Sequence, residues 1–546
     1  MASVDAEKAI QIEVARPASL RPAETATDAS QLESAAPIRT AASEIPYTVF
    51  SPAKKKAICA AATFSALVSP LATNIYFPSL TIIADDLNVT VELVNITVTT
   101  YMILQGVAPT FWGTFADVCG RRPVYLTTIL VFVLANLVLA LQHSYAGLLI
   151  VRMLQSAGSS ATIAIGTGTI ADVTVQSERG TYMGMFSGTL MIAIAIAPIF
   201  GGVLTQAPYG WRSMFFFLFA ASTLLLLLLF VLMPETGRDI VGNGSIPARG
   251  WNRTLIQILA DRKKKDSTKS RPTKSRFGNP LRCLQLIMEK DVGIVLLANG
   301  LVYTSFYCVT VGFSSQMKVV HGLNTLQIGL CFLPYGLGCA IGSMVGGKFL
   351  DREFSRYAAR AGYKDARTVR NDIEFPIERA RLQIIWYNIA LVAGDCIAFG
   401  WTFRENISIA VSLVLLFFNG FGCTNLFNNV SVLLMDLYPQ ESASITASNN
   451  FVRCLMGAAG SAVIDKVINA VGMGWAYVIV AVMALLATPL LLAEFFWGHG
   501  WRRARHEKLL RLKEKQEQTD NKREELKRDN ATEEPGTVES DGISAP

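Results

Sequence analysis

The sequence predicts an all-α membrane protein built from twelve transmembrane helices in two six-helix bundles. Of its 546 residues, 51% are hydrophobic and only 17% are charged, whereas a soluble protein carries about 25% charged residues. The apolar residues fall in runs of about 20, long enough to cross a hydrocarbon core of about 30 Å as helices. Because backbone polar groups inside lipid must be satisfied within their own segment, these runs are expected to be helical.

The apolar runs form two sets of six, separated by a polar stretch at residues 236–290. The first set is expected at approximately 57–80, 91–113, 123–142, 146–172, 181–204 and 211–233. The second set is expected at approximately 292–316, 326–350, 381–402, 406–436, 445–470 and 474–497.

The polar segments complete the predicted domain organisation. Residues 1–52 are rich in Ala, Ser, Thr, Pro and Glu, so they are expected to form a disordered cytoplasmic tail and not a cleavable signal peptide. An N-terminal bundle is then expected over 53–235, a cytoplasmic loop over 236–290, a C-terminal bundle over 291–498 and a charged cytoplasmic tail over 499–546.

Basic residues give the expected orientation, because cytoplasmic loops of membrane proteins are enriched in Lys and Arg. They lie before the first run, in four of the alternate loops and after the last run: Lys54, Lys55, Lys56, Arg121, Arg122, Arg179, Arg262, Lys263, Lys264, Lys265, Arg352, Arg356, Arg360, Lys364, Arg367, Arg370, Arg502 and Arg503. Of the intervening loops, 81–90 has none, and two others offer only Lys318 and Arg404. Both termini are therefore expected in the cytoplasm, with the sequons at Asn88 and Asn406 outside as candidate glycosylation sites.

Charge and cysteine content exclude several other classes of protein. The net charge of +7 requires no nucleic-acid partner, since the basic residues lie beside membrane helices. Most of the nine cysteines lie in apolar runs, where a free thiol behaves as a small hydrophobe, and no CxxC or Cys/His spacing indicates a disulfide framework or a metal site. The chain also lacks the phosphate-binding loop of nucleotide-driven pumps and the HExxH motif of zinc proteases, so no enzyme is expected.

A short motif recurs in the two halves. Gly113-Thr-Phe-Ala-Asp117 follows the second run, and Gly347-Lys-Phe-Leu-Asp351 follows the eighth. A glycine four residues before an aspartate, at the same place in each half, indicates an internal structural repeat. Many secondary transporters are built from such repeats, with the substrate site between the halves at mid-membrane.

These and three further groups of residues are typical of one family. Gly113, Asp117, Gly120, Arg121 and Arg122 match its loop 2–3 motif; Arg152, Gln155 and Gly158 match its span 4 pattern; and Ala197, Pro198, Gly201 and Gly202 match its span 5 antiporter motif, with Ala197 where glycine is usual. Over about residues 55–498 the sequence resembles the major facilitator superfamily, within it the twelve-span drug:proton antiporters. Residues 74–80, 375–382 and 436–453 resemble stretches typical of fungal quinidine-resistance-like exporters.

The resemblance implies the major facilitator fold and a secondary transporter that works as a monomer without a cofactor. Its expected function is export of a drug, toxin or secondary metabolite in exchange for protons, by alternating access. The expected location is the plasma membrane, with the vacuolar membrane as the alternative. A carrier that takes up a nutrient or a polyamine would share the fold and is the alternative function.

The charged turn between the second and third runs is predicted to be a cytoplasmic gate. The resemblance pairs the loop 2–3 arginine with Asp172, at the end of the fourth run. Asp117, Arg121 and Asp172 are expected to form a charge network that holds the two bundles together when the carrier is open outward. Gly113 is expected to let the neighbouring bundle approach, and Gly120 to permit the turn.

Proton coupling is expected to involve Arg152, Gln155 and an acidic residue. A charge at mid-bilayer costs about 2.5–3.5 kcal/mol on insertion scales, so Arg152 should face the protein interior, either to respond to substrate and proton or as a structural arginine. Because arginine does not deprotonate in a usable pH range, the proton carrier must be another group. Asp395 and Asp465 are the deepest acids in the runs, and either or neither can fill this role.

Two further groups of residues are expected to shape the transport path. Pro198 with Gly201 and Gly202 should kink the fifth span and allow close helix packing, which the resemblance associates with blocking leakage. The candidate substrate-binding residues are Asn74, Tyr76, Tyr303, Phe306, Tyr307, Asn425, Asn428 and Arg453, with Asn429, Asn449 and Asn450 nearby. Aromatic and amide groups suit a bulky, partly apolar ligand that can be cationic, and simple packing is the alternative role of the aromatic residues.

Overall fold

The computed structural model describes residues 48–174, 176–248, 250–255, 257, 282–363, 374–405, 407–438 and 442–532. Within these ranges the chain is helical and contains no strand. The N-terminal residues 1–47, the basic run 262–265 and the sequon at Asn406 lie outside them.

The first half of the chain supplies six long helices. Its elements are α1 (Pro52–Asn74), η2 (Phe77–Ser79), α2 (Leu80–Asp86), α3 (Val91–Cys119), α4 (Arg121–Leu141), α5 (Tyr145–Val173), α6 (Gln176–Leu204) and α7 (Arg212–Leu232), followed by the short α8 (Arg238–Val241) and η3 (Gly250–Asn252).

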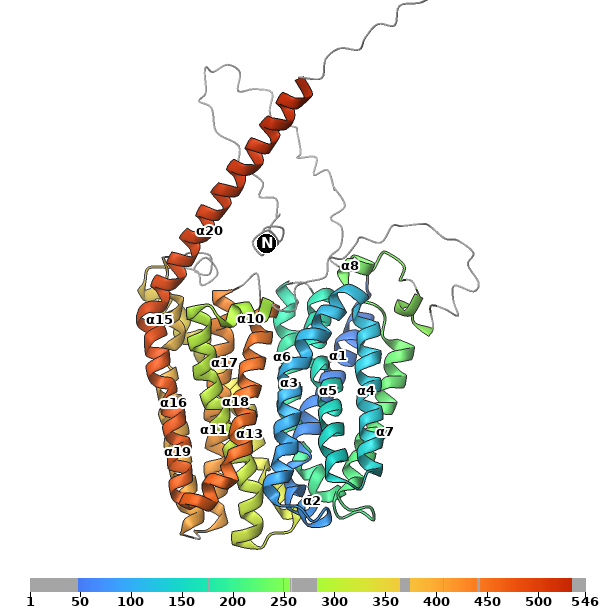
Figure 1. The fold of residues 1–546 in the computed structure, drawn as a ribbon, viewed down its shortest axis with the longest axis vertical. Helices are drawn as coiled ribbons and strands as arrows, with labels where there is room; N and C mark the ends of the chain where they lie inside the picture. Colours follow the sequence, from blue (N-terminus) through green and yellow to red (C-terminus); the bar gives the residue numbers. More distant parts are fainter. Residues whose placement is uncertain are drawn as a thin grey trace, which may run out of the picture. The chain divides into compact units, whose positions relative to one another are not determined.

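The second half repeats this plan and continues into a long C-terminal helix. Its elements are α10 (Arg282–Ile287), α11 (Lys290–His321), α12 (Thr325–Cys331), α13 (Leu333–Arg360), α15 (Ile377–Leu382), α16 (Ile385–Arg404), α17 (Ile409–Leu437), α18 (Ser442–Val471), α19 (Met473–Leu485) and α20 (Ala487–Thr532). Figure 1 shows the two sets of helices side by side, those of the first half in blue to green and those of the second in yellow-green to red. The predicted fold of two six-helix bundles is confirmed.

Local sequence explains where the helices begin and break. The side chains of Ser51, Thr90 and Ser144 cap α1, α3 and α5 by accepting a backbone N–H bond in the first turn, which satisfies a donor that has no partner inside the helix. The first predicted span breaks after Asn74, where Pro78 in the Asn-Ile-Tyr-Phe-Pro-Ser-Leu stretch allows only the short η2 before α2. The second span is longer than predicted and ends at Cys119.

By length and hydropathy, eleven helices in the described part of the chain can cross a membrane, and α18 is not among them. The sequence predicted twelve spans. With 30 residues α18 is long enough, but it carries Asn449, Asn450, Arg453 and Asp465 among its apolar residues. Asn449 accepts a hydrogen bond from Asn299 of α11, and Asn450 and Asp465 bond α3, so α18 is an interior helix of the bundle.

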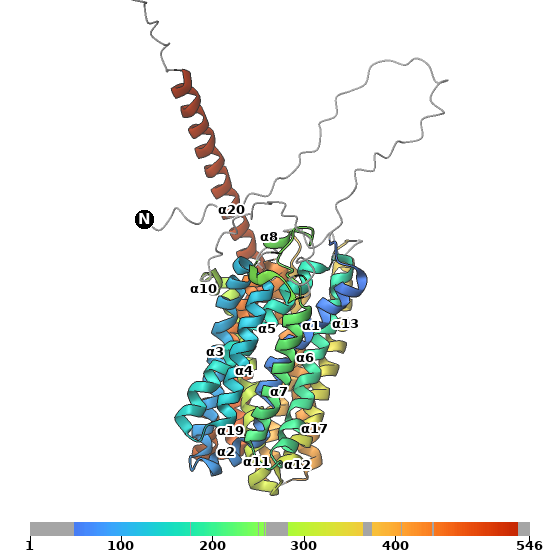
Figure 2. The same cartoon turned by 90° about the vertical axis from the view of Figure 1, so that its right-hand side faces the viewer.

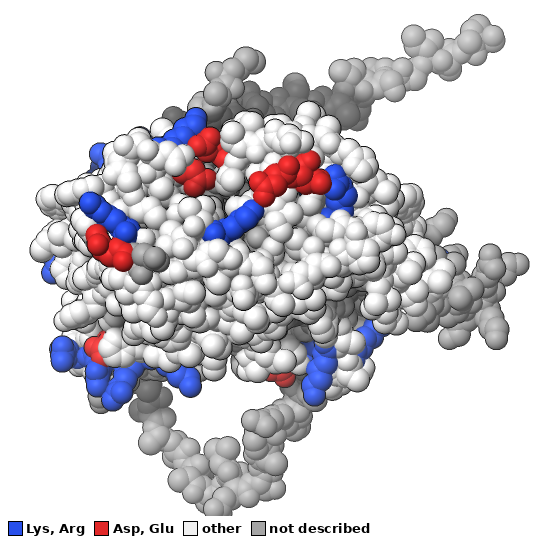
Figure 3. Space-filling view, turned by 90° about the horizontal axis from the view of Figure 1, so that it is seen from below, with Lys and Arg blue, Asp and Glu red and all other residues white. Residues whose placement is uncertain are grey.

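The two bundles are tightly packed at the end that carries α2. Ser314 of α11 donates a hydrogen bond to the backbone oxygen of Phe77 at 2.5 Å, and Lys318 pairs with Asp85 at 2.9 Å. Figure 2 shows the ends of α2, α11 and α12 together at this end of the molecule. Seen from there, the charged side chains on the central face are few, and they lie beside charges of opposite sign, whereas Lys and Arg gather along one edge of the view (Figure 3).

Glycines show how far this close packing extends along α6. A Cβ added at Gly202 would lie 2.7 Å from the backbone oxygen of Thr325, and one added at Gly336 would lie 2.1 Å from Ala195, both across the bundle interface. Nearer the opposite end, a Cβ added at Gly188 of α6 or Gly347 of α13 would meet no atom within 4 Å. The structure is therefore in a conformation closed at the α2 end.

A pair of glycine substitutions tests how closely α6 packs against its own bundle at the α2 end. A Cβ at Gly201 would lie 2.1 Å from the backbone oxygen of Ile75, so we expect Gly201→Ala to destabilise the protein by about 1–3 kcal/mol through overpacking. Gly188→Ala is the matched control, since space is open there and alanine favours a helix by about 1 kcal/mol. Thermal unfolding of the detergent-purified variants measures the difference; equal melting temperatures would contradict the packing argument.

Candidate functional site

The charged turn predicted as a gate is a compact ion-pair network in the structure. Arg121, at the start of α4, contacts Asp117 of α3 at 2.8 Å and Asp172 at the end of α5 at 3.0 Å. The Arg121 and Asp172 side chains are largely buried, whereas that of Asp117 is mostly exposed. Both ion pairs lie within the first bundle, at the end opposite α2. The close approach expected at Gly113 does not occur in this conformation, since an added Cβ there would meet nothing within 4 Å.

Glu235 completes this turn and was not predicted from the sequence. Its buried carboxylate accepts hydrogen bonds from the backbone N–H groups of Arg121 at 2.8 Å and Arg122 at 3.1 Å, at the start of α4, and from those of Thr236 and Gly237. Burial raises the pKa of Glu235, and the four backbone donors oppose that rise. Gly120 is required here, because its φ is +107° and a Cβ would lie 2.4 Å from the Glu235 carboxylate.

Arg122 has a different role from that of its neighbour. It is 1% exposed, and its guanidinium donates to the backbone oxygens of Met233 at 3.0 Å and Phe230 at 2.6 Å. These bonds satisfy carbonyls at the C-terminal end of α7 that have no partner in the helix. Arg122 therefore joins α4 to the last turn of α7 and is not merely a surface charge that sets topology.

The second half contains an equivalent network. Arg381 of α15 bonds Asp436 at the end of α17 through Nε at 3.0 Å and Nη2 at 2.9 Å, and its Nη1 lies 3.5 Å from Asp351 of α13. Asp351 corresponds to Asp117 and Asp436 to Asp172, so the repeat predicted from Gly113–Asp117 and Gly347–Asp351 extends to the whole ion-pair network. Sequence spacing did not reveal Arg381, because a long insertion separates it from Asp351.

Arg152 is enclosed in the first bundle. It is 1% exposed, its guanidinium lies 4.1 Å from the ring centre of Tyr76 and 4.5 Å from that of Tyr101, and its Nη1 donates to Gln155 at 2.7 Å. Gln155 in turn donates to Asn136 at 2.7 Å. Two aromatic rings and a chain of two side-chain amides thus surround the Arg152 cation. No carboxylate of the described residues forms an ion pair with it.

Arg453 of α18 has similar surroundings in the second bundle. Its guanidinium lies 4.7 Å from the ring centre of Tyr303 and 6.0 Å from that of Phe427, and its Nη2 donates to Asn450 at 3.0 Å. Phe306 and Tyr307 pack on Tyr303, with ring centres 5.9 and 4.9 Å from it. The structure thus brings four predicted substrate-binding residues together and adds Phe427, which nothing in its sequence context distinguishes.

The other predicted substrate-binding residues lie elsewhere. Asn74 donates to the Pro70 backbone oxygen of its own helix at 2.8 Å, and Tyr76 is fully buried, with its hydroxyl 2.9 Å from that of Thr97. In α17, Asn425 bonds the Phe421 backbone oxygen and Asn428 bonds Ser343 of α13. Asn74 and Asn425 thus bond within their own helices and Asn428 bonds α13, and none of these bonds involves Arg453.

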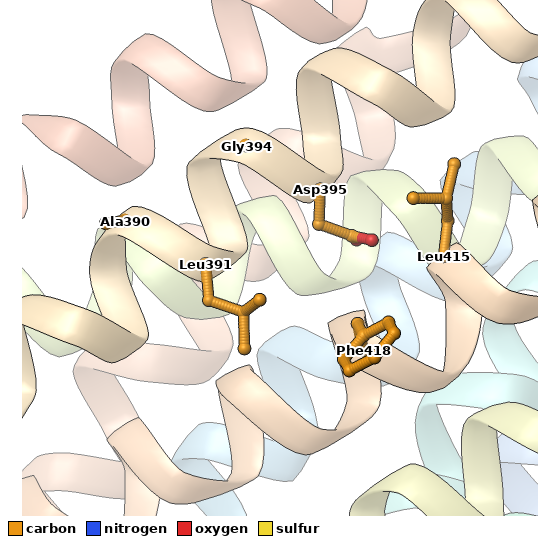
Figure 4. Close-up of a pocket in the computed structure, with 6 residues that line it drawn as sticks. All are labelled: Ala390, Leu391, Gly394, Asp395, Leu415 and Phe418. Carbon is orange, nitrogen blue, oxygen red and sulfur yellow. The ribbon is translucent and has the colours of Figure 1, made fainter.

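The two predicted proton carriers differ in their surroundings. Asp395 is 5% exposed and lines a pocket of about 270 Å³ between α16 and α17, where Figure 4 shows it among Leu391, Leu415 and Phe418. Neither of its carboxylate oxygens makes a hydrogen bond to the described residues. Asp465, in contrast, accepts a hydrogen bond from the side-chain amide of Asn95 on α3, so it lies directly at the contact between the two bundles.

The span 5 motif lies at the same contact. Ala197 is fully buried, and the backbone oxygen of Pro198 lies 2.5 Å from the position of a Cβ at Gly329 of the other bundle. Gly202 approaches Thr325, as described above. The predicted close packing at these residues thus joins α6 to α12. Asn88, the one predicted glycosylation site among the described residues, is exposed after α2.

Asp117→Asn tests the gate network. The substitution removes one charge beside Arg121 but leaves Asp172 in place, so we expect transport to slow several-fold while the apparent affinity for substrate changes little. Initial rates over a range of substrate concentrations separate the two effects. An unchanged maximal rate would contradict a role in gating.

Arg152→Ala tests the enclosed arginine. The change removes the only charge between the Tyr76 and Tyr101 rings, so we expect loss of transport with normal amounts of protein at the cell surface. Arg404→Ala is a matched control, because Arg404 also lies over an aromatic ring, that of Trp401 at 4.7 Å, but at the exposed end of α16. A fully active Arg152→Ala protein would show that this arginine is only structural.

Comparisons with known proteins agree with this geometry. Residues 62–461 match the model of the Major Facilitator Superfamily. The chain is 37% identical over 473 residues to "Citrate exporter 1" of Aspergillus niger, covering 85% of this chain and 90% of that protein. It is 36% identical over 468 residues to "MFS-type transporter tstD" of Talaromyces stipitatus, covering 84% of each.

Among solved structures, the fold resembles the xylose transporter XylE from E. coli with a TM-score of 0.57 and 14% identity, covering 82% of this chain and 98% of that one. It also resembles the human transporter MFSD10 with a TM-score of 0.52 and 17% identity, covering 81% of this chain and all of that one. The repeated ion-pair networks, the paired bundles and these matches lead to one conclusion: the chain belongs to the Major Facilitator Superfamily and is a membrane transporter, not an enzyme.

Proposed function

We propose that this protein exports a small organic molecule in exchange for protons, by alternating access. The observation that carries the proposal is the hydrogen bond between Asp465 of α18 and Asn95 of α3. It places a titratable group where the two bundles meet, so that gain or loss of a proton acts directly on their contact.

Alternating access requires two bundles that can separate at either end while the substrate lies between them. The close contacts at the α2 end, through Phe77, Asp85 and Gly202, belong to one of the two required states. The networks around Arg121 and Arg381 lie at the opposite end, where the bundles must meet in the other state. Their equivalent positions in the two halves support a gating role.

The chemistry of Asp465 and Asn95 gives proton binding a definite effect. In the structure the amide nitrogen of Asn95 donates to Asp465, while its buried amide oxygen has no hydrogen-bond partner among the described residues. A protonated carboxyl group can donate to that oxygen, so that the acid and the amide exchange two hydrogen bonds. Protonation of Asp465 therefore strengthens closure at the α2 end, and loss of the proton weakens it.

The direction of transport follows from the effect of Asp465 protonation on closure at the α2 end, together with the expected orientation in the membrane. Lys and Arg residues lie mainly at the end opposite α2, which favours that end as cytoplasmic, and α20 extends from the same end (Figure 1). A proton taken up from outside would then close the outer side and return the carrier to the inward-facing state. The names of the relatives, a citrate exporter and MFS-type transporters, support export, and the plasma membrane is the proposed location.

Efflux from proteoliposomes tests the proposal. Vesicles containing the purified protein are loaded with a defined panel of organic acids, their neutral amides and amines of similar size, and released compounds are identified by mass spectrometry. We expect a proton gradient directed into the vesicles to accelerate efflux and a protonophore to abolish that acceleration. Efflux that ignores both would contradict proton exchange, and accumulation from outside would support the alternative uptake carrier.

Two aspartate variants identify the proton-binding group. Asp465→Asn should retain efflux down a substrate gradient but lose its acceleration by protons, because an amide cannot titrate. Asp395→Asn is the matched control, since Asp395 is also an aspartate within a long helix of the second bundle but lines a pocket formed by α16 and α17 of that same bundle, and it should keep the acceleration. The reverse result would assign proton binding to Asp395.

A further inference from the structure

We propose that the transported molecule is an organic anion, and that Arg453 binds its carboxylate group. This inference rests on the proposed export function and adds to it the class of substrate. It follows from the distribution of charge between the bundles, and it differs from the partly apolar, cationic ligand that the aromatic and amide residues alone suggested.

Each bundle contains one interior arginine held by aromatic rings and an amide. Arg152 lies over Tyr76 and Tyr101, and Arg453 lies over Tyr303 and Phe427. Each guanidinium also bonds one side-chain amide, from Gln155 or Asn450, and each has a buried Nε without a hydrogen-bond partner among the described residues. The ring faces and amides lower the cost of burial, but they do not neutralise the charge.

The two arginines differ in whether a substrate can reach them. Arg152 is 1% exposed and enclosed within the first bundle, so a substrate cannot reach it in this conformation. Arg453 is partly exposed. Its neighbours come from α11 and α17, and the adjacent Asn450 donates to the backbone oxygen of Gln105 on α3 at 2.8 Å. Arg453 therefore lies where helices of both bundles meet, at the position expected for a substrate between them.

The charge at this position selects an anion. The ring faces of Tyr303 and Phe427 that would attract a cation are already next to the guanidinium, and a second cation would be repelled by it. A carboxylate instead gains charge-assisted hydrogen bonds to the guanidinium of Arg453, whose planar shape can bind both carboxylate oxygens. Tyr303, Phe306 and Phe427 form an aromatic wall beside it, with Phe306 and Phe427 in edge-to-face contact at 5.5 Å. This wall suits the apolar body of such an acid.

The efflux panel described above tests the substrate class by comparing each acid with its own neutral amide and with an amine of similar size. The acids should be released by the wild-type protein and the amides and amines retained. Arg453→Gln should slow release of the acids at least about tenfold, the loss expected when one partner of a buried charge pair is removed. Arg453→Lys keeps the charge but not the bidentate geometry. It should release the acids at a rate between those of the wild-type protein and Arg453→Gln.

Arg404→Gln is the matched control and should export at the wild-type rate. Size-exclusion chromatography and thermal unfolding show whether each variant is folded, and Arg453→Lys provides the test if Arg453→Gln is not. Release of amines or amides in place of acids would overturn the anion proposal and leave proton-driven export standing. Release of acids at an unchanged rate by both Arg453 variants would overturn the role of this residue. Absence of any release by the wild-type protein would count against export itself, and against this inference with it.

Discussion

The structure depends on one constraint, which is that a charge placed among membrane helices must be neutralised or hydrogen-bonded there. Arg121 and Arg381 each form ion pairs with two carboxylates, and Arg122 donates hydrogen bonds to backbone carbonyls at the end of α7. Because every partner comes from another helix, these charges fix how the helix ends are arranged at the side opposite α2. Three interior groups meet this constraint only in part. Arg152 and Arg453 donate to side-chain amides but have no opposite charge among the described residues, and Asp395 has neither an opposite charge nor a hydrogen bond there.

Close backbone contacts at glycines explain how the two bundles can both hold together and separate. At the α2 end, Gly202, Gly329 and Gly336 let backbones of opposite bundles approach to distances that a Cβ would forbid. Such contacts form through van der Waals packing, because lipid gives helices no hydrophobic reason to associate. They are numerous but individually weak, so a small change in a polar contact at the same interface, such as that of Asp465 with Asn95, can shift the balance between the closed and open states.

The fold could be predicted almost completely from the sequence, and the site only in part. Runs of apolar residues reveal helices because the bilayer imposes their length. The span expected at 445–470 is a helix, α18, but it is less apolar than the others, since its polar side chains have partners in α3 and α11. The pair of Arg121 with Asp172 was predicted because Arg121 lies in a recognisable motif and the family resemblance pairs that arginine with the acid at the end of the fourth run. Arg381, Glu235 and Phe427 were missed, since each gains its role from a neighbour distant in sequence. Spacing along the chain carries no information about such contacts.

The two halves share one plan, and their differences bear on the proposed coupling of substrate to proton. Both contain the network at the helix ends and an interior arginine, but the first half encloses its arginine while the second exposes it between the bundles. Arg453 and Asp465 lie on the same helix, α18, about 18 Å apart at 1.5 Å per residue. Both ends of this stretch contact α3, through Asn450 and Gln105 at one end and through Asp465 and Asn95 at the other. Any movement of α18 against α3 therefore alters the proposed anion site and the proposed proton site together, so a single rigid helix is sufficient to couple them.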